Sequence, residues 1–326
     1  MIDLPPLSAL IGGRLSENVS DLRGRIETAA EESATGRRAD LTSHLGGTIG
    51  KAMLSQKAVT DLEQERTRIG FRDARLDIIQ RSLADLHDDA NEVNVRMLGA
   101  LGAEDGPSQS AAARGAEAAL EQAFSALNAR FGERYLFSGD ATSTKPFASV
   151  DRLLDDVRNI AETATDAADF EAQLDIYFND PAGGWRTDIY SGSDTATDPD
   201  AVTGMDAGLR RLVSGLAVYA ISAPGDWPAL IEGNPSILQD ASTRVGEGQA
   251  QIMTLRADRG VVQAEIAERL ETIDSEETLL TNAFNDMAAR DQYEAATELR
   301  ELERNLEAAY LLTSRLANLS LLNYLR

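Results

Sequence analysis

The sequence predicts a mainly α-helical protein in which both chain ends form a long antiparallel coiled-coil rod, with a small mixed α/β insert domain between them. Three observations support this fold class. Apolar residues recur at three-four spacing over long stretches near both ends. Aromatic residues make up only 5% of the 326 residues. Six of the nine prolines lie between residues 146 and 235, so the middle of the chain differs in character from its ends.

The N-terminal part is expected to contain two helices joined by a looser segment. Apolar residues from 15 to 29 share one helix face, and this pattern breaks up near four glycines between residues 36 and 50. The second helix follows from the longer series Leu62, Ile69, Leu76, Ile79, Leu83, Leu86, Ala90, Val93 and Met97. We then expect a turn at 102–107 and an alanine-rich third helix at 110–130.

The C-terminal part is expected to form one very long helix. Its apolar series comprises Leu255, Val262, Ile266, Ile273, Leu280, Phe284, Met287, Leu299, Leu302, Leu306 and Tyr310. Neither proline nor glycine follows Gly260, so the pattern predicts a helix of about seventy residues with at most a kink. Because so long a helix needs a partner, we expect residues 62–97 to pair antiparallel with residues 255–287.

The middle of the chain is expected to combine strands and helices. Residues 134–147 alternate aromatic and polar side chains, as a strand and turn would. Residues 151–178 have helical character. Trp185, Ile189 and Tyr190 follow at strand-like spacing within 183–192, before a polar loop that extends to residue 199. The aromatic side chains Phe131, Tyr135, Phe137 and Phe147 are interpreted as a small hydrophobic core rather than a ligand platform.

Both ends of the chain are strongly apolar, although the formal net charge is -23. Residues 308–326 contain seven leucines, two tyrosines and two charged side chains, and their leucines fall on more than one helix face. The first fifteen residues contain six leucines and isoleucines against one acid and one base. Exposed apolar surface of this kind is unfavourable in water and is usually buried against a partner. We therefore predict that the subunit polymerises through its termini. The candidate assembly interface comprises Leu4, Leu7, Leu10, Ile11, Leu15, Leu312, Leu316, Leu319, Leu321, Leu322, Tyr324 and Leu325.

These patterns predict four segments along the chain. Residues 1–50 are the N-terminal assembly helix and link, and residues 51–138 are the N-terminal rod helices. Residues 139–250 are an outward-facing mixed α/β insert. Residues 251–326 are the C-terminal rod and assembly helix.

Composition and motif spacing argue against other functions. The acidic charge disfavours nucleic acid as a partner, and no apolar run is long enough to insert into a membrane. The chain has no cysteine, and its start lacks the pattern of a cleaved secretory signal. The glycines near Lys51 do not have phosphate-loop spacing.

Side chains that could bind a metal are also weak candidates. His44 and His87 have no second ligand at metal spacing, and His87 is interpreted as part of a solvated polar face. The acidic loop with Asp194, Asp198 and Asp200 lacks the glycine and glutamate of a calcium loop, so we expect a solvated turn. We therefore expect no catalytic, cofactor or metal site and no enzymatic activity.

Three segments resemble the bacterial flagellin superfamily, and most closely its hook-filament junction members of the hook-associated protein 3 type. Arg134, Tyr135, Leu136, Phe137, Ser138 and Gly139, followed by Lys145, Pro146 and Phe147, resemble the family's strand and turn. The ending Leu-Ser-Leu-Leu-Asn-Tyr-Leu at 319–325 is similar to the family's C-terminus, and Ala-Thr-Gly-Arg-Arg at 34–38 is similar to its Ser-Thr-Gly-Lys-Arg segment. The chain departs from the family at 41–43, where Leu-Thr-Ser stands near the place of Asp-Asp-Pro.

The resemblance implies a structural subunit of the bacterial flagellum that joins hook to filament by polymerising through its terminal helices. It implies an extracellular location, reached through the flagellar type III system without a cleaved signal peptide. The implied partners are further copies of the chain, the hook-side junction protein and flagellin, with a cytoplasmic export chaperone on the C-terminal helix. Two alternatives remain, namely a filament flagellin and an unrelated type III secreted tip or coiled-coil structural protein.

Overall fold

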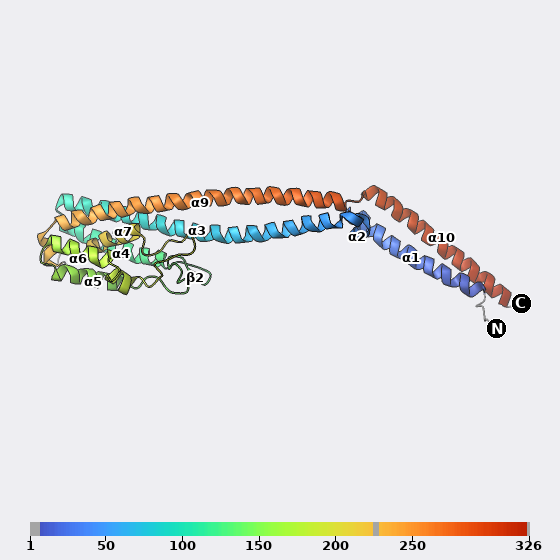
Figure 1. Cartoon of the computed structure of the whole chain (residues 1–326), viewed down its shortest axis with the longest axis horizontal. Helices are drawn as coiled ribbons and strands as arrows, with labels where there is room; N and C mark the ends of the chain where they lie inside the picture. The colour runs from blue at the N-terminus through green and yellow to red at the C-terminus, as the bar shows by residue number, and fades with distance from the viewer. Residues whose placement is uncertain (1–6, 224–227, 325–326) are drawn as a thin grey trace. The chain divides into compact units, whose positions relative to one another are not determined.

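A computed structural model describes the backbone of residues 7–223 and 228–324, and the side chains of these residues except 7–15, 48 and 316–324. The elements are α1 (Leu7–Thr35), α2 (Leu41–Leu45), a 3-10 turn (Gly46–Thr48), α3 (Ile49–Ala103), α4 (Gly106–Leu127), β1 (Arg130–Phe131), β2 (Arg134–Tyr135), α5 (Val150–Thr163), α6 (Ala167–Asn179), a π-helical turn (Trp185–Ile189), α7 (Ala207–Ala220), α8 (Ala229–Gly233), α9 (Ser236–Ala288) and α10 (Gln292–Tyr324) (Figure 1). The mainly α-helical fold class is confirmed.

The chain divides into two compact units. Unit 1 comprises Met1–Arg66 and Glu271–Arg326, and unit 2 comprises Thr67–Leu270. The long helices α3 and α9 each contribute to both units. The four segments predicted from the sequence follow expected roles rather than these units, and they stay a prediction.

In unit 1 the two terminal helices α1 and α10 lie side by side (Figure 1). Small or aliphatic side chains fill the line between them, and Ala29, Ala295 and Leu302 are all buried. Arg23 donates a hydrogen bond of 2.6 Å from Nη2 to the hydroxyl of Tyr310, and its guanidinium lies 5.8 Å from the centre of that ring. The pairing of segments from both chain ends agrees with the prediction.

Helices α3 and α9 also lie alongside each other, as three hydrogen bonds within unit 2 show. Gln80 Nε2 donates to the carbonyl of Arg256 at 2.8 Å, and Gln249 Nε2 donates to the carbonyl of His87 at 3.2 Å. Ser242 Oγ and Asn94 Oδ1 are 3.0 Å apart. The residue numbers rise along α3 as they fall along α9, so the two helices are antiparallel, as expected.

The register of this pair differs from the predicted one. Because Asn94 contacts Ser242, the C-terminal end of α3 pairs with residues that precede 255. Helix α9 begins at Ser236, whereas the sequence patterns placed the C-terminal rod from 251 onward. The first turns of α9 bury Ile237, Leu238, Ala241 and Val245. Burial of a large aliphatic side chain stabilises by about 1.5–3 kcal/mol, which outweighs the cost of about 1 kcal/mol for each glycine at 246 and 248.

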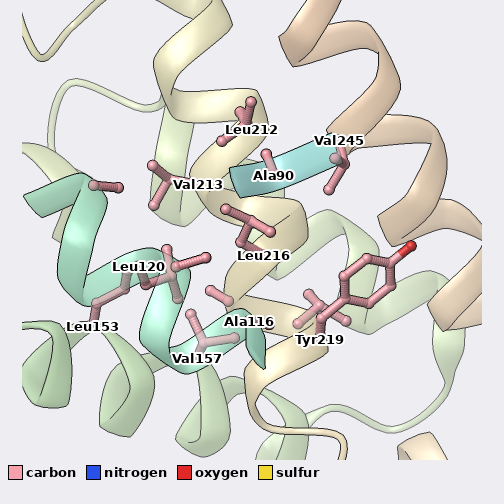
Figure 2. Packing of buried hydrophobic residues seen from close by; sticks show 14 of the residues in the cluster. Ala90, Ala116, Leu120, Leu153, Val157, Leu212, Val213, Leu216, Tyr219 and Val245 are labelled. Atoms are coloured by element: carbon pink, nitrogen blue, oxygen red, sulfur yellow. The ribbon is translucent and has the colours of Figure 1, made fainter. Parts of the chain in front are cut away.

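The core of unit 2 surrounds helix α7. Figure 2 shows Leu212, Val213 and Leu216 of this helix between side chains of α3, α4, α5 and α9. Those neighbours are Ala90, Ala116, Leu120, Leu153, Val157 and Val245, all of which are buried. Helix α7 is therefore enclosed by apolar partners on several sides, unlike a surface helix with one apolar stripe.

An aromatic cluster adjoins this core. The ring centre of Phe147 lies 5.8 Å from that of Trp185 and 5.4 Å from that of Tyr190. Trp185 Nε1 donates a 3.0 Å hydrogen bond to the carbonyl of Gly204, so its one polar atom is satisfied. Phe137 and Phe147 are buried, which agrees with their interpretation as core residues.

The prediction of a strand at 183–192 is wrong. Trp185–Ile189 forms a single π-helical turn, and strand-like pairing there is limited to one bridge between Tyr190 and Phe147. Trp185, Ile189 and Tyr190 are all buried, so their spacing indicated which side of the segment is buried. A helical turn and a strand can both bury three side chains at this spacing, so such a short pattern does not distinguish the two structures.

Candidate assembly site

Ten of the twelve predicted assembly residues belong to the two terminal helices, α1 and α10. Leu312 is 56% exposed and its neighbour Leu311 is 59% exposed, although α10 is paired with α1. The remaining members on α1 are Leu7, Leu10, Ile11 and Leu15, and those on α10 are Leu316, Leu319, Leu321, Leu322 and Tyr324; their side chains lie outside the described residues. Leu4 and Leu325 lie wholly outside them.

Further apolar side chains of unit 1, outside the predicted assembly residues, are exposed. Met53 and Leu54 are 60% and 68% exposed, Leu279 is 70% exposed and Tyr293 is 83% exposed. Met53 and Leu54 precede the helical series that begins at Leu62, and Leu279 and Tyr293 fall between members of the C-terminal series, so the three-four spacing does not include them. Their exposure means that unit 1 presents apolar surface outside its terminal turns as well.

The junction of α9 and α10 is a helix break, which corrects the expectation of one helix with at most a kink. Helix α9 ends at Ala288 and α10 begins at Gln292. Between them the chain pairs with the link after α1, because Arg38 N donates to the carbonyl of Ala288 and Arg290 N donates to the carbonyl of Gly36, both at 2.9 Å. A tertiary contact therefore ends α9, and a search for proline and glycine does not detect such a cause.

The side chain of Arg290 anchors this junction. It is 10% exposed and ion-paired with Glu32 at 3.3 Å, Glu294 at 3.0 Å and Glu298 at 2.8 Å. Glu32 is 11% exposed at its side chain, and it also accepts a 3.1 Å hydrogen bond from the backbone N–H of Ala39. Three carboxylates around one guanidinium thus join α1, the link and α10.

Two local features shape the break. Gly36 has a φ of +65°, a conformation that glycine adopts with little strain, and it turns the chain out of α1. Asp291 caps α10, since its carboxylate accepts hydrogen bonds from the backbone N–H groups of Tyr293 at 2.8 Å and Glu294 at 3.2 Å. The spacing of Asp291 and Glu294 is that of a capping box, and this signal could have located the start of α10.

The strand-turn motif of the flagellin resemblance lies in unit 2. Arg134 and Tyr135 form β2, which pairs antiparallel with β1, and the guanidinium of Arg130 lies 4.9 Å from the centre of the Tyr135 ring. Leu136, Phe137, Pro146 and Phe147 are buried, and Gly139 has a φ of +59°. A Cβ on Gly139 would lie 2.6 Å from the carbonyl oxygens of Ser193 and Thr195. The buried residues of this motif therefore anchor the turn at Gly139 to the core of unit 2, close to the backbone of residues 193–195.

The acidic loop is only partly the solvated turn that was expected, because Asp194 is exposed whereas Asp198 and Asp200 pair with α3. The side chain of Asp200 is 7% exposed and forms a bidentate ion pair with Arg72 of α3, in which Arg72 Nη2 donates to Oδ1 at 2.9 Å. Asp198 pairs with Arg75 at 3.3 Å. The hydrogen bond from Arg72 lowers the pKa of Asp200, against the opposing effect of burial. The two arginines, spaced three apart on α3, hold this loop against that helix. They lie far from the loop in the sequence, so local sequence patterns do not predict these ion pairs.

Within the described residues, no group of three or more metal-ligating side chains forms a metal site. No helix in that part of the chain is long and apolar enough to cross a membrane. His87 is only partly exposed, and its carbonyl accepts the hydrogen bond from Gln249, so its helix face packs against α9 instead of being fully solvated.

Comparisons with known proteins bear on the C-terminal part of the chain. Residues 243–325 match the family model described as the bacterial flagellin C-terminal helical region. This part of the chain is flagellin-like. It covers most of α9 and all described residues of α10. The crystal structure of Bacillus cereus FlgL matches with a TM-score of 0.45 and 14% identity, over 73% of this chain and 99% of that one. A search of curated proteins gave no match.

Proposed function

We propose that this chain is a structural subunit of the bacterial flagellum that joins hook to filament by polymerising through its terminal helices. The flagellin-like region at 243–325 carries this proposal, because it includes α10, the helix with the exposed Leu311 and Leu312. Helix α10 pairs with α1, so one pair of helices contains both predicted halves of the assembly surface.

The proposed partners follow from this role. They are further copies of the chain, the hook-side junction protein and flagellin, and before export a cytoplasmic chaperone that covers the apolar C-terminal helix. The proposed location is the extracellular flagellum, reached through the flagellar type III system without cleavage of a signal peptide. In this assembly the insert at 139–250 faces outward.

A filament flagellin is the second candidate, since the C-terminal match is to flagellin itself. The two functions differ in what the purified protein forms. A filament subunit polymerises alone into long filaments, whereas a junction subunit adds a short zone to the end of an existing hook.

The proposal is tested by placing two carboxylates in the assembly surface. A strain that lacks the protein is complemented with the double variant Leu316→Asp and Leu322→Asp. A buried, unpaired carboxylate costs several kcal/mol, enough to oppose association. We expect hooks, flagellin in the medium and no attached filaments, while circular dichroism of the purified variant stays helical.

The control is Ile176→Asp, which adds one of these carboxylates to a 59% exposed apolar position of the insert. Cells with this control should have normal filaments. Normal filaments in cells with the double variant would mean that the C-terminal leucines do not form the junction contact.

A further inference from the structure

At the break between α9 and α10, two backbone groups form hydrogen bonds to the link in place of helical ones. In a continuous helix the N–H of Arg290 would donate to the carbonyl of residue 286, and the carbonyl of Ala288 would accept from the N–H of Gln292. Here Arg290 N donates to the carbonyl of Gly36, and the carbonyl of Ala288 accepts from Arg38 N, at 2.9 Å each. Docking of the link therefore costs these groups no hydrogen bond, and its removal would leave them free to form the helical ones.

The residues at the break favour a helix on their own. The sequence from 288 to 292 is Ala-Ala-Arg-Asp-Gln, with no proline and no glycine. Alanine, arginine and glutamine are among the strong helix formers. The one local residue that opposes continuity is Asp291, whose side chain caps α10. The break thus depends on the docked link, on the ion pairs of Arg290 and on this cap.

We propose that residues 289–291 are a two-state joint whose conformation is set by docking of the link Gly36–Arg38. With the link docked, the joint is broken and α10 pairs with α1. With the link undocked, the joint is helical and α9 and α10 form one continuous helix from Ser236 to Tyr324. The position of the N-terminal segment is in this way coupled to the direction of the C-terminal helix. This coupling does not depend on the proposed flagellar role.

The distance between two spin labels measures the state of the joint. The chain has no cysteine, so Ser275→Cys and Glu303→Cys, both at exposed positions, label one site on each side of the break. These sites are 28 residues apart, which corresponds to about 42 Å in a continuous helix. Double electron-electron resonance on the full chain should give a shorter distance for the docked, broken joint.

The variant that undocks the link is Gly36→Pro. Proline fixes φ near -65°, which excludes the observed +65° and removes the N–H that donates to the carbonyl of Glu32 at 2.9 Å. We expect a narrow distance peak at about 42 Å in this variant. The matched control is Gly36→Asn, because asparagine tolerates positive φ and the atom nearest to its Cβ would be the movable end of the Gln292 side chain, at 3.1 Å. This variant should keep the wild-type distance.

Two further variants keep the test decisive. Asp291→Ala leaves the link intact but removes the cap, so it should raise the fraction of molecules at the long distance. Adding Ala289→Pro to Gly36→Pro should abolish the long distance, because proline breaks the helix. A Gly36→Pro sample that keeps the wild-type distance or gives only a broad distribution would overturn the joint. So would an Asp291→Ala sample that matches wild type.

Discussion

Truncation of Leu83 tests whether the α3 seam stabilises unit 2. Leu83 lies in the centre of the buried series on α3, is 0% exposed, and belongs to the same buried cluster as Leu120 and Leu216. Leu83→Ala removes buried methyl groups and leaves a cavity, which costs about 2–5 kcal/mol. A unit of this size loses about 2–4 °C in melting temperature for each kcal/mol, so a cost of about 3 kcal/mol predicts a decrease of about 6–12 °C.

The matched control is Leu98→Ala, the same substitution on the same helix at a side chain that is 46% exposed. Thermal unfolding is followed by circular dichroism and by calorimetry, which separates the transitions of units 1 and 2. We expect the control to shift the unit 2 transition by much less than Leu83→Ala. Equal shifts in the two variants would refute the placement of Leu83 in the seam.

Two further predictions concern the loop and the turn beside α3. Arg72 lowers the pKa of Asp200, so this pair contributes stability above the ordinary aspartate pKa of about 4 and loses it as the pH falls through the lower pKa of the folded state. The difference in unfolding free energy between wild type and Asp200→Asn should therefore be greatest near pH 7 and shrink below about pH 4; a difference independent of pH would contradict the ion pair. Gly139→Ala should destabilise more than Gly132→Ala, because both glycines have a φ of +59° but only at Gly139 would a Cβ meet backbone oxygens at 2.6 Å. Chemical denaturation of both variants checks this, and equal losses of about 1 kcal/mol would show that the contact at Gly139 has no effect.

The parts of the fold that follow from periodicity could be predicted from the sequence. On α3 the side chains from Leu76 to Met97 in the three-four series are all buried. On α9 the buried Ile266 and Ile273 belong to the corresponding series. Such series indicate which face of a helix packs against a partner. The presence of these helices and their antiparallel pairing could therefore be predicted from the sequence.

Features that depend on tertiary contacts could not be predicted from the sequence. The α9–α10 break is formed by hydrogen bonds to Gly36 and Arg38, about 250 residues away in the chain, and no local pattern contains them. The pairing of Asp200 with Arg72 likewise joins a loop to a helix through the fold. The Asp291 cap is the one of these features with a local signal, the capping-box spacing of Asp291 and Glu294, which the prediction of a continuous helix did not include.

The assembly residues were predicted from composition and not from contacts. An excess of leucine over charge at 308–326 indicates a surface that needs cover, and the exposure of Leu311 and Leu312 fits that indication. Composition alone does not identify the covering surface, because any apolar partner would satisfy it. The choice of partner therefore rests on the flagellin-like region.

The central claim is that this chain occupies the junction between hook and filament. Immunogold labelling of isolated hook-filament structures, with an antibody raised against the insert at 139–250, measures its position directly. We expect gold in a short zone at the distal end of the hook, and no gold along the filament or in a strain that lacks the protein. Labelling along the whole filament would identify a filament subunit instead, and the absence of label from hook-filament structures would contradict the flagellar role.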